Sequence, residues 1–207
     1  MGTCEQPQAR PSTESSDDPL FFYRSGDLHG VFSQWHYGYF CVSNSLIEDV
    51  CGTHLGSSSP GESTTFNCAE QCMMYCKAAV FSDLERQRWI LEAESPRAQQ
   101  TVGRSVKNYD ETRWSTVRSQ IVEMANYAKF SQDVERKKCL LDTGNRELVE
   151  AARHDRVWGI GFYGKTSKER RIALENRENW GENRLGRALE RVRARLRSEE
   201  DVEMGSD

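Results

Sequence analysis

The stretch Asn67–Asp83 (NCAEQCMMYCKAAVFSD) constrains the fold of this chain more than any other segment. Its apolar residues recur at helical spacing, which predicts about three turns of helix with one buried stripe. Asn67 precedes the first helical residue and is the candidate N-cap. The buried stripe would consist of Ala69, Cys72, Met73, Cys76 and Val80.

A second stripe on the same predicted helix carries charge among apolar residues: Glu70, Met74, Lys77 and Phe81. Glu70 and Lys77 are separated by nearly two turns, so they share a face and lie about 10 Å apart along the helix axis. Burying an acid and an amine is costly unless each finds a partner. Either the two groups neutralise each other or their neighbours, or they face a cleft.

The length of 207 residues suits one domain with a substantial core. Charged residues make up 29% of the chain and the mean hydropathy is −0.76, but much of this polarity lies in the ends and the last helix. Residues 1–19 and 198–207 are predicted to be disordered polar or acidic tails around an ordered domain at 20–197.

The sequence also predicts where the protein works. No run of about 18 apolar residues is present, which argues against a membrane span. The N-terminus lacks a basic region followed by an apolar one, so we expect no secretory signal. Seven cysteines, an odd number, point to reduced thiols inside a cell. The expected location is the cytoplasm, with the nucleus as the alternative.

The remaining elements are predicted from periodicity and turn residues. Helices are expected from Asp83 to Ala93, after Pro96, from about Thr112 or Asp110 to Phe130, and around Leu185–Leu196. Short aromatic-rich strands are expected between Phe32 and Val42, with a further strand near Glu147–Ala151. Residues 51–65 are predicted to form a mobile Gly/Ser loop.

Two motifs match known patterns for a phosphate loop and a metal site, but their sequence context favours other interpretations. Gly159–Thr166 matches both the phosphate-loop and the dinucleotide patterns, but about 40 residues remain after it, too few for a nucleotide-binding sheet. A flexible basic loop is the better interpretation, although Lys165 could still contact a phosphate. Cys68, Cys72 and Cys76 recur every fourth residue, yet packing as small apolar residues is favoured over a metal site. We therefore predict no metal and no cofactor.

Aromatic residues beside Asn, Asp and Gly are the more informative pattern. Trp158 follows Asp155 and precedes Gly159 and Gly161, and Trp180 stands in a similar setting. Such a composition suits a site for a base and a sugar, because an aromatic ring stacks on the base and glycine lets the backbone approach. A tryptophan that simply covers a turn is the alternative.

Taken in order along the chain, a set of motifs resembles the NADAR family. The resemblance runs from about Phe21 to Leu196, and the ordered set is far more specific than any single motif. The motifs are Ala69-Glu70-Gln71, Met74, Lys77-Ala78, Phe81-x-Asp83, Pro96, Gly103-Arg104, Trp114, Lys129-Phe130, Leu148-Val149-Glu150-Ala151, Asp155-x-x-Trp158-Gly159-x-Gly161, and Gly181-x-Asn183-x-Leu185-Gly186 with Arg193.

This resemblance implies a compact, helix-rich α+β domain with a small β-sheet and an enzyme that hydrolyses N-glycosidic bonds. The family's substrates are phosphoribosylated pyrimidine intermediates of riboflavin synthesis, or ADP-ribose attached to guanine in nucleic acid. The resemblance implies catalytic roles for Glu70, Lys77, Lys129 and Asp155. It implies substrate binding by Arg104, Trp114, Arg118, Trp158, Gly159, Gly161, Asn183 and Gly186.

Residues 162–179 are longer and more basic than in bacterial members of the family, which favours a substrate with several phosphates, or nucleic acid. The expected partner is therefore a nucleotide-sugar or ADP-ribosylated nucleic acid, with no membrane and with the oligomeric state left open. The alternative function is a module that binds ADP-ribose or a nucleotide without cleaving it. That module would need neither Glu70 nor the lysines.

Overall fold

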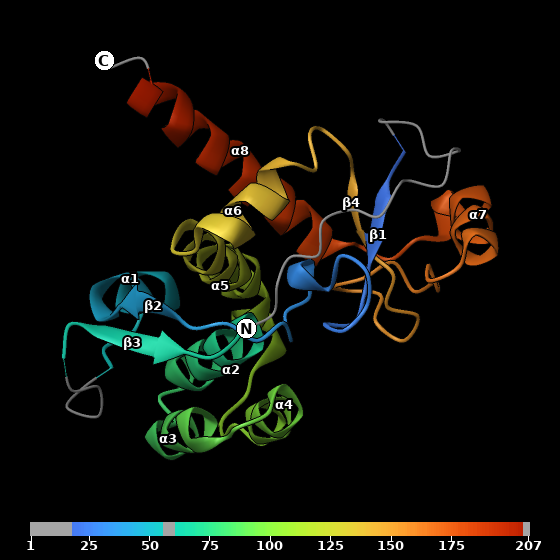
Figure 1. Ribbon diagram of the computed structural model, residues 1–207. Coiled ribbons are helices and arrows are strands. Elements are labelled where there is room, and N and C mark those ends of the chain that lie inside the picture. Colours follow the sequence, from blue (N-terminus) through green and yellow to red (C-terminus); the bar gives the residue numbers. More distant parts are fainter. Residues whose placement is uncertain (1–17, 56–60, 205–207) are drawn as a thin grey trace. The chain divides into compact units, whose positions relative to one another are not determined.

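A computed structural model of the protein describes residues 18–55 and 61–204, with the element order shown in Figure 1. The chain divides into two compact units. Residues 34–132 form one, here called the central unit. The segments before it and after it, up to Ser33 and from Asp133, form the other, here called the terminal unit.

The central unit is built on a buried helix and a two-stranded antiparallel sheet. Strands β2 (Phe40–Ser43) and β3 (Ser63–Phe66) pair antiparallel, with Phe40 opposite Phe66 and Ser43 opposite Ser63. The helices are α1 (Asn44–Cys51), α2 (Ala69–Val80), α3 (Leu84–Glu92), α4 (Pro96–Arg104) and α5 (Glu111–Ser131). Helix α2 packs against α3, α4 and α5, so it forms the centre of this unit.

The structure confirms the helix predicted after Asn67 and its inward-facing cysteine stripe. Every residue of α2 except Lys77 is buried, and Cys72 and Cys76 have no exposed surface. The predicted cap is wrong, because Cys68 occupies the N-cap position and makes no side-chain cap bond. Asn67 instead accepts a hydrogen bond from Gln99 Nε2 at 3.0 Å and donates its backbone N–H to Gln71 Oε1 at 2.7 Å.

The next three predicted helices are confirmed, and each begins at a capping residue. The side chains of Asp83, Ser95 and Asp110 accept hydrogen bonds from the backbone N–H three residues further on. These bonds satisfy amides that the first turn of a helix leaves unpaired. Asp110, and not Thr112, is the cap of α5.

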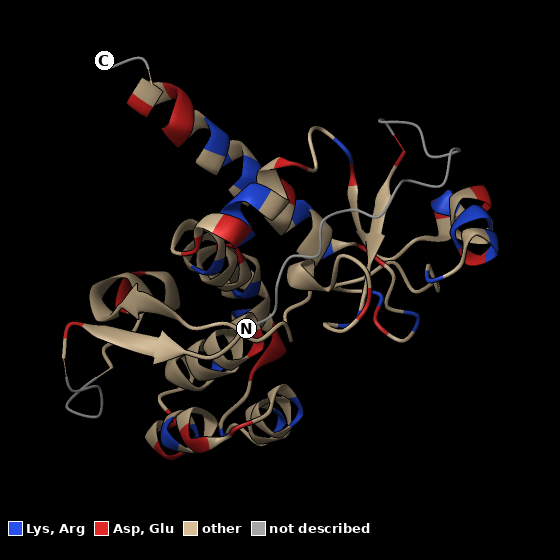
Figure 2. Cartoon of the chain, in the orientation of Figure 1, with Lys and Arg blue, Asp and Glu red and all other residues tan. Residues whose placement is uncertain are grey.

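The terminal unit pairs strand β1 (Leu20–Phe22) in parallel with β4 (Leu148–Glu150). Buried Phe21, Val149, Ala151, Ile160 and Ala173 form a core cluster beside these strands. The helical elements are η1 (Gly30–Phe32), α6 (Val134–Leu141), α7 (Ser167–Glu175), η3 (Arg177–Asn179) and α8 (Arg184–Met204). Lysine and arginine residues, blue in Figure 2, occupy many positions of α7 and α8.

Several segments differ from the sequence-based predictions. Phe32 lies in a 3₁₀ turn, and strand β2 begins only at Phe40. The aromatic-rich segment between them is therefore not a strand. Of the predicted loop 51–65, Cys51 ends α1 and Ser63–Thr65 belong to β3. Residues 56–60 lie outside the described residues, as do 1–17 and 205–207.

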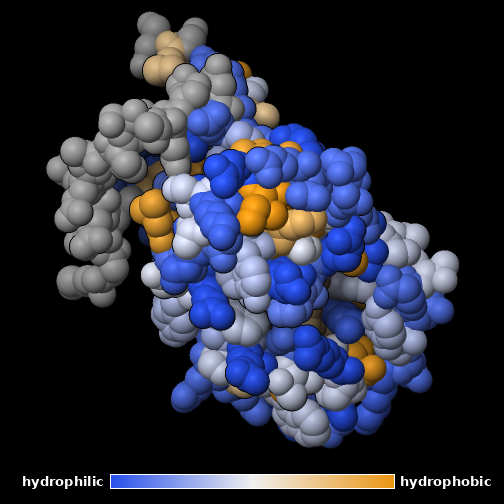
Figure 3. All heavy atoms as spheres, turned by 90° about the vertical axis from the view of Figure 1, so that its right-hand side faces the viewer, coloured by the Kyte–Doolittle hydropathy of each residue, from blue (hydrophilic) through white to orange (hydrophobic). Residues whose placement is uncertain are grey.

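The predicted tail from residue 198 is helical as far as Met204. Two ion pairs involve this last part of the helix, one from Arg195 to Glu199 at 2.9 Å and one from Lys137 to Glu200 at 3.0 Å. Helix α8 is long but highly charged. Across 18–55 and 61–204, no helix combines the length and apolar character needed to cross a membrane. The face seen in Figure 3 is mainly hydrophilic, with apolar side chains in small separate spots.

Candidate functional site

Lys77 lies at the centre of a charged and aromatic cluster in the central unit. Its Nζ stands 4.3 Å from the centroid of the Tyr109 ring and 5.9 Å from that of Trp114. Burial lowers the pKa of Lys77 below its usual value, and the positive charge of Arg104 lowers it further. Glu111 and then Glu70 oppose this shift, in that order of strength. An amine with a lowered pKa is more readily neutral and nucleophilic.

The order of these effects bears on whether Glu70 and Lys77 neutralise each other, the question that the sequence of α2 raises. Glu111 influences Lys77 more strongly than Glu70 does, so the two charges on α2 are not primarily a pair with each other. The lysine sits against aromatic rings contributed by the loop before α5 and by α5 itself.

Tyr109, Glu111 and Arg118 form a network beside Lys77. The Tyr109 hydroxyl donates to Glu111 Oε2, and Arg118 Nη1 donates to Glu111 Oε1 at 2.7 Å. Burial and the Glu111 carboxylate raise the pKa of Tyr109 to about 12, while the Tyr109 hydrogen bond lowers the pKa of Glu111. At neutral pH the network therefore holds a neutral phenol and a charged carboxylate. Within the described part of the chain, Arg118 Nε is buried and has no hydrogen-bond partner.

Helix α4 reaches α2 closely enough to bring Arg104 into this region. A Cβ added at Gly103 would lie 2.2 Å from Met74 Sδ, far inside van der Waals contact. A side chain at 103 would therefore force Met74 to move, whereas glycine lets the two helices meet at Met74, one turn before Lys77. Arg104 follows directly and is exposed.

Glu70 and Lys129 lie toward the other end of α2. Glu70 is 5% exposed and its backbone N–H donates to the Gln34 carbonyl at 3.0 Å. Lys129 has no exposed surface, and its Nζ lies 5.0 Å from the centroid of the Phe130 ring. Both charges act on Cys68 at the start of α2, where burial raises the thiol's pKa to about 11, Glu70 raises it further and Lys129 opposes the rise.

In the terminal unit, Asp155 organises the loop that contains Trp158. Its Oδ1 accepts hydrogen bonds from the backbone N–H groups of Val157 and Trp158, both at 2.8 Å. Gly159 packs against Ala152 so closely that an added Cβ would lie 2.8 Å from the Ala152 Cβ. Gly161 adopts a φ of +77°, in the left-handed region that favours glycine. Trp158 is partly buried beside this loop.

Asn183 and Gly186 hold strand β4. Asn183 Oδ1 accepts from the Glu150 N–H at 3.0 Å, and its Nδ2 donates to the Leu148 carbonyl at 2.8 Å. A Cβ at Gly186 would lie 1.9 Å from the Leu148 carbonyl oxygen, so only glycine fits there. These contacts give both residues a structural role. Their predicted contact with substrate stays a prediction.

The predicted site residues thus fall into two sets, one in each unit. Sequence reasoning missed Tyr109 and Glu111, because Tyr-Asp-Glu before a helix is what an ordinary capped helix start contains. The central unit holds Glu70, Lys77, Arg104, Trp114, Arg118 and Lys129, and the terminal unit holds Asp155, Trp158, Gly159, Gly161, Asn183 and Gly186.

The glycine loop before α7 does not have the surroundings of a phosphate loop. Lys165 Nζ lies 3.3 Å from Asp27 Oδ1. The side chain of Thr166 caps α7 and shares a capping box with Glu169. In the described segment 151–158, which follows the end of β4 at Glu150, no strand leads into the loop. Among the residues that the structure describes, no group of three or more His, Cys, Asp or Glu side chains could hold a metal ion.

Comparison with known proteins places this arrangement in a family. N-glycosidase R617 of Acanthamoeba polyphaga mimivirus is 38% identical over 126 residues, which cover 60% of this chain and 71% of that protein. Protein irg-1 of Caenorhabditis elegans is 33% identical over 134 residues, 63% of this chain and 61% of its own. N-glycosidase YbiA of Escherichia coli K12 is 31% identical over 122 residues, 59% of this chain and 67% of YbiA.

The fold agrees with these sequence matches. The NMR structure of E. coli YbiA superposes with a TM-score of 0.64 and 25% identity, covering 92% of each chain. This confirms the predicted helix-rich α+β fold with small sheets. At the level of the family, the relatives' names confirm the expected enzyme class, a hydrolase of N-glycosyl bonds. The NADAR domain matches residues 21–197, almost the whole described chain. The protein therefore belongs to the NADAR domain family.

Proposed function

We propose that this protein is an N-glycosidase that releases a base from a ribosyl-phosphate or ADP-ribosyl conjugate. The observation that carries the proposal is the Lys77 cluster: an amine of lowered pKa between aromatic rings, on the same helix as a buried carboxyl group. The names of R617 and YbiA support the reaction class.

The chemistry needs an acid, a nucleophile and water. In our proposal Glu70 is the general acid that protonates the ribose ring oxygen, and the ring opens as the base nitrogen forms an imine with the anomeric carbon. The neutral amine of Lys77 adds to that carbon. A proton passes from the lysine nitrogen to the base nitrogen, the bond between the base nitrogen and the anomeric carbon breaks, and the base leaves as the lysine imine forms. Water then hydrolyses the lysine imine, which frees the sugar and restores the amine. Lys129 is the alternative nucleophile.

The substrate would carry phosphate and a planar base. Arg104 and Arg118 are the proposed phosphate partners, since guanidinium groups bind phosphate through several N–H donors. Trp114 would pack against the base or ribose. For the terminal unit, we propose that Asp155 and Trp158 contribute to base and sugar binding.

Two substrate groups fit this chemistry. One is phosphoribosylated pyrimidines; a protein of Vibrio vulnificus named for riboflavin biosynthesis is 26% identical over 180 residues, 87% of this chain and 39% of its own. The other is ADP-ribosylated guanine in an oligonucleotide. Incubating the protein with each substrate in turn and separating the free base by chromatography would distinguish them.

Trapping tests the covalent step. Borohydride added during turnover should reduce the lysine imine, and mass spectrometry of peptides should locate the sugar on Lys77. Glu70→Gln should lower turnover about 100-fold or more, the size of a general-acid contribution. Lys107→Ala, at an exposed lysine, is the matched control. Activity that survives both Lys77→Ala and Lys129→Ala would sink the covalent step. Binding of ADP-ribose without release of base would favour the non-catalytic module.

A further inference from the structure

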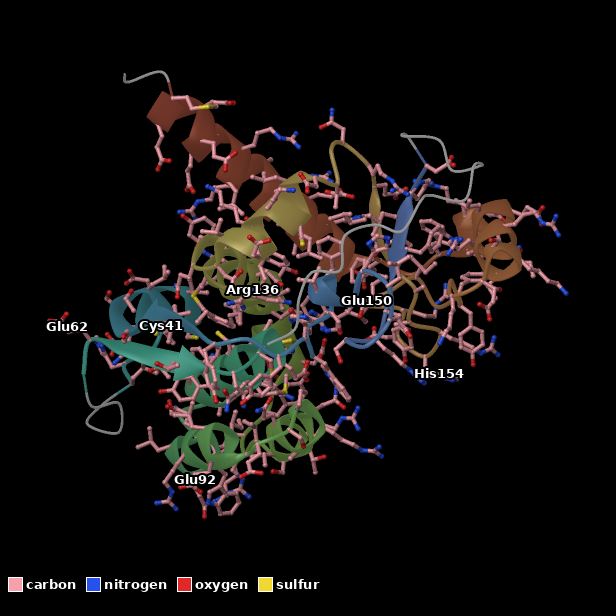
Figure 4. The ribbon with its side chains drawn as sticks, viewed as in Figure 1. Cys41, Glu62, Glu92, Arg136, Glu150 and His154 are labelled. Atoms are coloured by element: carbon pink, nitrogen blue, oxygen red, sulfur yellow. The ribbon has the colours of Figure 1, made fainter. Side chains whose placement is uncertain are left out.

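A groove in the central unit lies apart from the predicted site residues. Its volume is about 700 Å³. One wall is β3, and the other is Leu91–Glu94, which comprises the end of α3 and the two residues after it. Gln71 joins the two walls, because its Nε2 donates to the Ile90 carbonyl at 2.9 Å and its Oε1 accepts from Asn67. Figure 4 labels Cys41 on β2 and Glu92 at the end of α3.

The two edges of the β2–β3 sheet differ. On β2, the backbone of Cys41 is already bonded: its N–H donates to Gln132 Oε1 at 2.8 Å, and its carbonyl accepts from Gln132 Nε2 at 2.7 Å. One glutamine side chain therefore closes that edge, as proteins commonly do with exposed strands.

The bonds to Cys41 also fix the direction of the backbone groups on β3. In an antiparallel pair, residues alternate between those bonded to each other and those whose N–H and C=O point outward. Cys41 points outward to Gln132, so Thr65 opposite it also points outward, away from β2. Ser63, two residues earlier, has the same direction. Within the described residues, neither Thr65 nor Ser63 has a hydrogen bond to its backbone N–H or C=O.

The side chains of the groove favour a positively charged ligand. Of the eleven described residues that line it, Glu92 and Glu94 alone are charged. Tyr37 and Tyr39 stand with 53% and 63% of their surface exposed and their rings 5.5 Å apart. Exposed tyrosine rings attract ammonium and guanidinium groups. The partner of Glu92 within the chain, Arg88, is 3.7 Å away with both side chains more than half exposed, a weak pair.

We propose that this groove binds an extended, basic peptide segment of another protein, which adds to β3 as a strand. Thr65 and Ser63 would supply the backbone hydrogen bonds, as in other cases of strand addition. Glu92, Glu94 and the two tyrosines would select lysine or arginine. Since β3 has four residues, the bound segment would span roughly 13 Å, about four residues at 3.3 Å each.

Charge argues against two other occupants. A second copy of the chain, pairing β3 with β3, would bring Glu92 and Glu94 of both copies into the same groove. Residues 1–17 of this chain contain three acidic residues, Glu5, Glu14 and Asp17, and one arginine, Arg10. Their net negative charge disfavours binding beside Glu92 and Glu94.

The experiment uses the full-length protein and fluorescent heptapeptides in anisotropy titrations. A peptide of alternating threonine and lysine should bind at least tenfold more tightly than one of alternating threonine and glutamate. The same lysine peptide, N-methylated on the amides of one edge, should lose most of its affinity because it cannot donate to the Thr65 and Ser63 carbonyls. Hydrogen exchange should slow at Thr65 and Ser63 on binding and stay unchanged at Thr64 and Phe66.

Two double variants test whether the charges of Glu92 and Glu94 determine the affinity for the peptide. Glu92→Gln with Glu94→Gln should lower affinity for the lysine peptide at least fivefold, whereas Glu175→Gln with Glu203→Gln, which changes the net charge equally, should not. Base release should be unchanged in both, so failure here is distinguishable from failure of the proposed function. Equal binding of the lysine and glutamate peptides, or undiminished binding of the N-methylated peptide, would overturn the proposal. Concentration-dependent dimerisation through β3 would point instead to a second copy.

Discussion

The surroundings of Lys77 decide what its amine can do. Two aromatic rings and the rest of the cluster remove water from the ammonium group, and Arg104 adds positive charge. Both effects favour the neutral amine. Glu111 compensates in part, yet its carboxylate is itself held by the Tyr109 hydroxyl and by Arg118. The surroundings of Lys77 thus lower the pKa of its amine, which favours the neutral, nucleophilic form that covalent catalysis uses.

This shift has a consequence for stability. The pKa of Lys77 in the folded protein lies below its ordinary value of 10.5. Between those two values the unfolded chain binds a proton that the folded protein has lost, so this group makes the free energy of unfolding rise with pH. We expect Lys77→Met to remove that rise. Its effect relative to wild type should thus be most favourable near pH 7 and shrink as pH approaches 10.5, measured by urea unfolding at several pH values.

Lys138→Met supplies a control of opposite sign. The Asp142 carboxylate raises the pKa of Lys138, so its contribution is present below pH 10.5 and is lost as pH rises through the folded pKa. Its substitution should slightly destabilise the protein, mainly at neutral pH. The same pH trend in both variants would contradict the assignment of a lowered pKa to Lys77.

At the scale of the element, strand β4 depends on a side chain outside it. Asn183, at a φ of +48°, bonds the backbone of both Leu148 and Glu150. Asn183→Ala should therefore cost about 2–4 kcal/mol, since it loses two buried hydrogen bonds and places alanine in a left-handed conformation. Chemical unfolding and faster hydrogen exchange at Glu150 would show this.

Two other substitutions at Asn183 separate the loss of the hydrogen bonds from the backbone strain. Asn183→Gly removes the bonds without the backbone strain, and Asn183→Asp keeps the acceptor for the Glu150 N–H. Both should be milder than Asn183→Ala. If Asn183→Ala unfolds like wild type and loses activity alone, the residue serves substrate binding and not β4.

The helices that could be predicted from the sequence are those with long apolar periodicity. Helices α2 and α5 show it plainly, and Pro96 marks α4. Helices α1, α6 and α7 were missed because each is short, buries only one to three residues and, unlike α3 and α4 on either side of Pro96, has no proline at one end. Their signals were caps: Ser43 before α1, Asp133 before α6, and the Thr166–Glu169 box before α7. Short helices depend on such caps and on tertiary contacts more than on periodicity.

The candidate site was predictable only in part. Residue types such as Glu70 and Lys77 stand out because charge on a buried helix is costly. Tyr109 and Glu111 do not, since their role arises from how the loop before α5 meets α2. Asn183 and Gly186 match family motifs, but only the structure shows that they support β4.

At the scale of the whole molecule, the central unit is one continuous segment, whereas the terminal unit is made of two segments of the chain. The hydrogen bonds and ring contacts described for Lys77, Tyr109, Glu111 and Arg118 all lie within residues 34–132. The β2–β3 sheet, the hydrogen bonds from Gln132 to its edge and the packing of α2 are also internal to that segment. A continuous segment with its own core is a candidate for independent folding.

We therefore expect a fragment of residues 34–132 to fold by itself, with a helical circular dichroism spectrum and a cooperative urea transition. Its Lys77 should keep a lowered pKa, measurable by NMR of the lysine side chain, because the groups that lower it are all present. A fragment of residues 34–104 should not fold, since it lacks α5, which packs against α1, α2 and β2. A molten 34–132 fragment, or one in which Lys77 titrates at its ordinary value, would show that the cluster needs the rest of the chain.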